Sequence, residues 1–192
     1  MFSVSQDDKT IARTVAEIFG NKPSVSRYWD NDHKSHVDLL VCQDTPTKNA
    51  NSYATVTLSN FQIGVIDGIP LGVELVAACE KRFIDMPNIV ASCAFNIVNS
   101  GYSCKPGAIF PNVIKAYNSQ VTMKHILFVT PFLWDRSFTT ITLASKKTAW
   151  LMLVPISDTE LDYAERMSSD KLEDIFQEKQ INVFDINRKS VI

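Results

Sequence analysis

Residues 148–154 read TAWLMLV and are almost continuously apolar. A strand without polar alternation is typical of the interior of a sheet that is covered on both faces. Pro155 follows closely and ends the segment, because proline has no backbone N–H for a further ladder hydrogen bond. The sequence therefore predicts a central strand here, and the rest of the fold is arranged around it.

Further strands are predicted on both sides of this one, from short apolar or alternating runs rich in β-branched and aromatic residues. The pair Asp67-Gly68 tolerates the positive φ angles of a tight turn, so a local chain reversal is expected there. The predicted strands are residues 24–29, 37–42, 52–58, 61–66, 72–78, 123–129, 138–143 and 182–186.

Helices are predicted where apolar residues recur at helical spacing. The first spans residues 5–19, with Ser5 as its N-cap, and the second spans the apolar stretch 87–100. Two short helices follow Ser157, which forms a capping-box pattern with Glu160. No linker divides the chain, so we expect one α+β domain over residues 1–192, with a mixed sheet and the helix near Cys93 packed on it.

The amino-acid composition limits the classes of function that the chain can have. The 192 residues are 45% hydrophobic and 21% charged, with a formal net charge of −2, so the basic excess typical of nucleic-acid binders is missing. No window reaches the about 18 uninterrupted apolar residues of a membrane span. The polar N-terminus is unlike a secretory signal. The four cysteines form no CxxC pair, and they predict reduced thiols in a cytosolic protein.

Two clusters contain residue types that could carry chemistry. His33 and His36, near acidic residues, could hold a metal, but a polar turn accounts for them as well. Cys104 with His125 could form a nucleophile and base, although no nucleophile signature surrounds Cys104. We therefore predict no catalytic residue, no metal and no cofactor, and we keep a small cysteine-dependent hydrolase as an alternative.

Charge is distributed unevenly along the chain. Residues 157–185 hold nine acids and three bases, a local charge of −6, so the remainder carries +4. Such asymmetry can steer a basic partner, although a solvated helix pair has the same pattern. Tryptophans in turns could anchor an interface or belong to the core. The predicted partner-binding residues are Glu160, Asp162, Glu165, Asp170, Glu173, Asp174, Trp134 and Asp135.

Several segments resemble the suppressor of fused (SUFU) domain family in order and spacing. They include GVELVAAC (72–79), NIVASCAFNIVNS (88–100), YSCKPGAIFP (102–111) and MKHILFVTPFLW (123–134). WLMLVPIS with Glu160 and the acidic KLEDIFQEKQINVFDINRKS continue the pattern, which is strongest over residues 28–190.

The resemblance implies an α/β fold that binds proteins and brings no catalytic residues. It also implies an immunity protein, or antitoxin, as in bacterial members that neutralise the nuclease domain of a secreted polymorphic toxin. The expected partner is then that toxin domain, bound directly, without nucleic acid or membrane. A regulatory scaffold that adds a peptide to a sheet edge is a further alternative.

Overall fold

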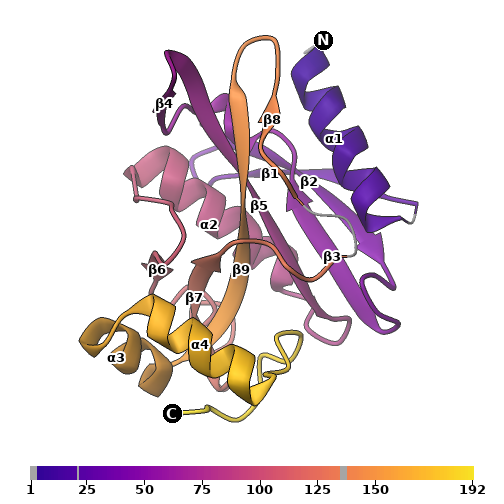
Figure 1. The fold of residues 1–192 in the computed structure, drawn as a ribbon. Helices are drawn as coiled ribbons and strands as arrows, with labels where there is room; N and C mark the ends of the chain where they lie inside the picture. The colour runs from indigo at the N-terminus through magenta and orange to yellow at the C-terminus, as the bar shows by residue number, and fades with distance from the viewer. Residues whose placement is uncertain (1–3, 21, 135–137) are drawn as a thin grey trace.

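The computed structural model of the chain describes residues 4–20, 22–134 and 138–192. These residues form helices on both faces of one sheet of nine strands (Figure 1). None of the helices in this part of the chain is long and apolar enough to cross a membrane. The elements in chain order are α1 (Gln6–Phe19), β1 (Ser24–Trp29), β2 (His36–Gln43), β3 (Ala50–Thr55), the 3-10 helix η1 (Leu58–Asn60), β4 (Gly64–Ile66), β5 (Ile69–Glu80), α2 (Met86–Ser100), β6 (Ile109–Phe110), β7 (Met123–Val129), β8 (Ile141–Thr142), β9 (Lys147–Ser157), α3 (Asp158–Arg166) and α4 (Ser169–Lys179).

The sheet is mixed, as predicted. Its strands follow the order β1-β2-β3-β5-β9-β7-β6, while β4 pairs with β5 and β8 with β9. β5 and β9 run parallel, and the other described pairs are antiparallel. The apolar stretch that begins at Thr148 lies in β9, between β5 and β7, and from Trp150 onward the strand is buried. Its predicted central position is confirmed.

Two apolar layers lie on opposite faces of the sheet. Successive strand residues point to opposite sides, so Leu39 belongs to one layer and Leu40 to the other. α2 covers the first face, and it contributes Ile89 and Cys93 to that layer. The second face is covered by α1, α3 and α4 (Figure 1). The predicted packing of the apolar helix on the sheet is therefore confirmed, together with the α+β class.

Two helices begin at the capping boxes that the sequence contains. Ser5 Oγ accepts a hydrogen bond from the Asp8 N–H at 3.0 Å, and Asp8 accepts one from the Ser5 N–H in return. Ser157 and Glu160 repeat this exchange at the start of α3. Each box satisfies two of the backbone N–H groups that a helix start leaves without an intrahelical partner.

A buried carboxylate that the sequence analysis did not single out holds η1 against the sheet. Glu74 lies within β5, is fully buried, and accepts hydrogen bonds from the N–H groups of Leu58 and Ser59. Burial raises the pKa of Glu74, and the hydrogen bonds oppose this shift. The contact is close, because a Cβ at Gly72 would lie 2.4 Å from the Ser59 carbonyl oxygen. Only glycine fits there without displacing backbone.

Four predicted strands are corrected by the structure. Residues 182–186 form turns, and their carbonyls accept single bonds from Glu80 and Met123 instead of a ladder. Of residues 138–143 only Ile141 and Thr142 are extended. Phe138, outside this short strand, packs its ring against Trp150. The third, predicted over residues 52–58, is β3, which ends at Thr55 before η1 begins. The fourth, predicted over residues 61–66, is extended only in β4, from Gly64 to Ile66.

Candidate functional site

A groove of about 660 Å³ lies between α4, the loop after β7 and the turn after α4. This volume falls within the roughly 300–1,000 Å³ typical of ligand pockets. We call it the acidic groove, and it is lined by Val129, Phe132, Leu133 and Val154, by Asp170, Glu173, Asp174, Phe176 and Gln177 of α4, and by residues 180–184.

The floor of the acidic groove is apolar. Phe176 of α4 lines it and is buried, one helical turn from the buried Leu172, which lies beneath the groove lining. Val129 and Val154 come from the neighbouring strands β7 and β9 and complete the floor. At the rim, Phe132 is 62% exposed although it is aromatic. The half-buried Leu133, Ile181 and Phe184 add to Phe132, so the groove offers accessible apolar surface above a buried floor.

One wall of the acidic groove carries three carboxylates. Asp170, Glu173 and Asp174 all project from the first part of α4, and Glu173 is half-buried. Burial raises the pKa of Glu173, and the nearby charges of Asp170 and Asp174 raise it further. An ion pair at this wall joins Lys171 and Asp174 at 3.2 Å, with both side chains largely exposed. The wall thus keeps a net negative charge that suits a cation.

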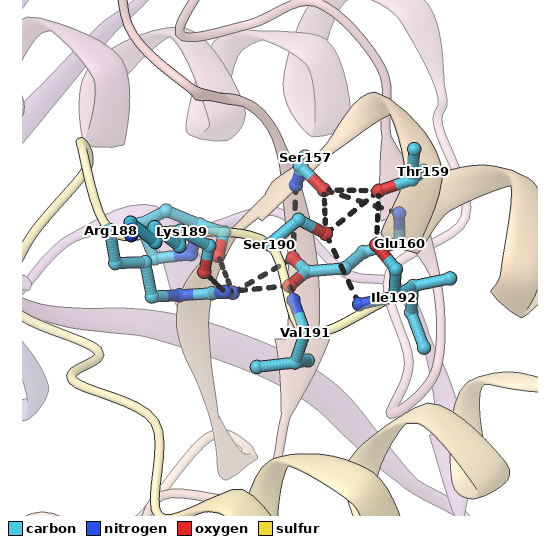
Figure 2. A network of polar contacts seen from close by, with 9 residues as sticks. Ser157, Thr159, Glu160, Arg188, Lys189, Ser190, Val191 and Ile192 are labelled. Atoms are coloured by element: carbon cyan, nitrogen blue, oxygen red, sulfur yellow. Dashed lines mark hydrogen bonds and ion pairs between the residues drawn. The ribbon is translucent and has the colours of Figure 1, made fainter.

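Glu160 is not available to a partner, contrary to the prediction. It is fully buried and bound by Arg188 through two hydrogen bonds, of 2.6 Å and 2.8 Å (Figure 2). Its carboxylate also accepts from the backbone N–H groups of Ser157 and Val191. The network ties the end of the chain to the start of α3, so Glu160 has a structural role.

Trp134 is also corrected, because it belongs to the core and not to the surface. It is 7% exposed, and its ring centroid lies 5.2 Å from those of Phe19 and Phe138. Its Nε1–H donates to the buried Ser52 Oγ at 3.0 Å. Asp135, predicted beside it, lies outside the described residues.

The remaining predicted acids divide into two groups. Asp170, Glu173 and Asp174 are brought together at the acidic groove. Asp162 and Glu165 are exposed on α3 and do not line it. The sequence analysis missed Phe132 and Leu133, and the only sequence signal is that the apolar run after β7 continues beyond the strand.

The Cys104–His125 pair lacks the features of an activated nucleophile. Burial raises the pKa of the Cys104 thiol, whereas a reactive cysteine needs a lowered one. His125 is 2% exposed, its Nδ1 accepts from the Asn112 N–H, and its Nε2 lies 3.0 Å from Asp158 Oδ1. Both ring nitrogens are therefore engaged away from the thiol. Cys79, Cys93 and Cys104 are free thiols in the structure.

His33 and His36 do not form a metal site with neighbouring acids. The rings of both histidines pack against Trp29, with centroid distances of 6.0 Å and 4.9 Å. Within the described ranges, no group of three or more histidine, cysteine, aspartate or glutamate side chains is placed to hold a metal ion.

Comparison with known proteins places this geometry in a family context. The family model "Suppressor of fused protein (SUFU)" matches residues 33–189. The immunity protein YqcF of Bacillus subtilis (strain 168) is 45% identical over 190 residues, which cover 98% of this chain and 99% of that protein.

Solved structures share the fold at low sequence identity. A SUFU homologue from Neisseria gonorrhoeae FA 1090 superposes with a TM-score of 0.69 at 15% identity and covers 97% of both chains. A chain of the Sufu–Fu complex has a TM-score of 0.69 at 13% identity, with 96% of this chain and 92% of that one covered. Drosophila Suppressor of Fused matches at a TM-score of 0.67 and 12% identity, over 94% of this chain and 50% of that protein.

Proposed function

The chain belongs to the suppressor of fused family, and on that premise we propose that it is an immunity protein that neutralises the nuclease domain of a cognate secreted toxin. It acts in the cytoplasm by binding the toxin domain directly. It performs no catalysis of its own. The near full-length similarity to an immunity protein supports the role, and the acidic groove is the observation that carries the binding mode.

The exposed acids of α3 and α4 supply the recognition chemistry. Asp162 and Glu165 on α3 and the three groove acids on α4 stand close to one another in the chain. A nuclease that grips an anionic backbone is basic around its active site. Acidic side chains can take the place of that backbone or shield the basic surface. Close charge pairs across such interfaces couple by about 1.5–7 kcal/mol.

The hydrolase alternative finds less support. A cysteine hydrolase needs a thiolate next to a base that is free to take its proton. Here the thiol pKa is raised by burial, and the histidine is held between a backbone N–H and Asp158. We therefore keep protein binding as the function.

Reversal of the acidic surface tests this proposal. A variant with four charge reversals is expected to associate with the toxin domain about 10- to 100-fold more slowly at low salt, because electrostatic steering is replaced by repulsion. It carries lysine at Glu165, Asp170, Glu173 and Asp174. Stopped-flow fluorescence gives the association rate, and the difference from the wild type should shrink as salt is raised.

A control variant carries lysine at Glu17, Asp32 and Asp67, which are exposed acids outside the groove and outside α3 and α4. It makes a comparable change of net charge and should associate much faster than the groove variant. An unchanged association rate, with unchanged protection of cells, in the four-residue variant would dismiss the acidic surface as the binding determinant.

A further inference from the structure

We propose that the acidic groove receives one short segment of the partner, in which a large apolar side chain stands next to an arginine or lysine. This inference rests on the proposed function for the identity of the partner, the toxin domain. It specifies which part of the acidic surface makes the contact and what the partner must present there.

The apolar half of the motif follows from the floor. The accessible apolar base of the groove is formed by Phe132, which is 62% exposed, and by the half-buried Leu133, Ile181 and Phe184. They lie over the buried Val129, Val154 and Phe176. Transfer of an apolar side chain from water onto this base is favourable in proportion to the area buried. A volume of about 660 Å³ holds a few side chains, not a whole helix or domain.

The cationic half follows from the wall. Glu173 is half-buried between Asp170 and Asp174, whose charges repel its own, and Lys171 pairs with Asp174 at 3.2 Å on the exposed side of the wall. A purely apolar occupant would remove water from Glu173 and make the repulsion worse. A guanidinium or ammonium group beside the apolar side chain removes this cost, because it pairs with the carboxylates as they are desolvated.

The groove acids and the α3 acids are therefore expected to act differently. A charge buried on binding controls mainly the dissociation rate, whereas a rim charge controls mainly the association rate. Replacement of Asp170, Glu173 and Asp174 by asparagine, glutamine and asparagine should raise the dissociation rate of the toxin domain by about tenfold or more. Replacement of Asp162 and Glu165 by their amides should lower the association rate and leave the dissociation rate nearly unchanged.

Phe132→Ala tests the apolar half. The side chain is exposed, so the variant keeps its fold, and we expect about tenfold weaker binding because an aromatic contact at the rim is lost. Ile84→Ala is the matched control, since Ile84 is 79% exposed and lies outside the groove. Its affinity should stay within about twofold of the wild type.

A second arm works without the toxin. A phage-displayed nonapeptide library is selected on the wild-type chain, and the enriched peptides are then tested on the groove variant with the three amide replacements. We expect an aromatic residue or leucine next to arginine or lysine, and loss of binding to the variant. Enriched peptides without a basic residue, or peptides that bind the variant equally well, overturn the inference.

The two arms separate failure of the groove from failure of the proposed function. If the wild type neutralises the toxin domain and the groove variants bind it as tightly, the groove inference is wrong and the immunity function stands. If the wild type does not bind the toxin domain, the proposed function is wrong, and the peptide arm decides the groove by itself.

Discussion

Arg188→Met is expected to lower the free energy of unfolding by about 3–5 kcal/mol, because it leaves Glu160 buried without its counter-ion. The pair is bidentate, and the two side chains are 6% and 0% exposed. Arg188 also donates to the Pro155 carbonyl and lies over the Phe176 ring at 5.2 Å, so it braces the helix that forms the groove. Urea denaturation followed by circular dichroism measures the change.

Two variants control for this effect. Lys34→Met removes one partner of an exposed pair with Asp32 and should cost no more than about 1 kcal/mol. The double variant Glu160→Gln/Arg188→Met removes both charges, so neither is left unpaired. Its loss of unfolding free energy should therefore be smaller than the sum of the losses in Glu160→Gln and Arg188→Met. A loss below about 1 kcal/mol in Arg188→Met alone would contradict the structural role of the pair.

Trp134→Ala is expected to cost about 3–5 kcal/mol, as truncations of buried aromatic side chains do. The change empties the space between Phe19 and Phe138 and removes the donor to Ser52 Oγ. Trp134→Phe should cost less, since it keeps most of the ring contacts and loses mainly the hydrogen bond. Thermal or urea unfolding of the purified variants measures both changes.

Phe132→Ala is the comparison for this series, because it removes an aromatic ring two residues away at a position that is 62% exposed. Its stability should stay within about 0.5 kcal/mol of the wild type. If Trp134→Ala left stability intact and weakened toxin binding, the interface role first predicted for Trp134 would be restored and its assignment to the core would be wrong.

Secondary structure was predictable where local pattern and tertiary environment agree. Residues 24–29 and 123–129 form β1 and β7 with the predicted bounds, and the Ser5 and Ser157 caps start α1 and α3. The pattern misled over residues 138–143, of which only Ile141 and Thr142 are extended, while Phe138 packs its ring against Trp150. Propensity cannot encode such a tertiary contact.

Charge counting predicted an acidic surface but could not tell free acids from paired ones. Glu160 is neutralised by Arg188, which lies three residues beyond the segment that was counted. Asp158 is paired with Lys124 of β7, far away in the sequence. Both cations come from outside the acidic segment. Only the folded structure therefore shows that these two carboxylates form ion pairs within the chain.

The acidic groove itself could not be predicted from the sequence. Its floor joins β7, β9 and α4 with the loop that holds Phe132, and these segments are brought together only by the sheet order β9-β7 and the packing of α4. The acids of α4 were recognised because helical spacing is local. Their apolar complement was not, because exposure of Phe132 is a property of the folded chain.

Co-expression in a bacterial host of this chain with the nuclease domain of its cognate toxin tests the central claim most directly. We expect growth to be restored and the two proteins to elute from gel filtration as one stable complex, while lysine at Glu165, Asp170, Glu173 and Asp174 abolishes both. Persistent toxicity with wild-type chain that is folded and abundant, or separate elution of the two proteins, would contradict the account.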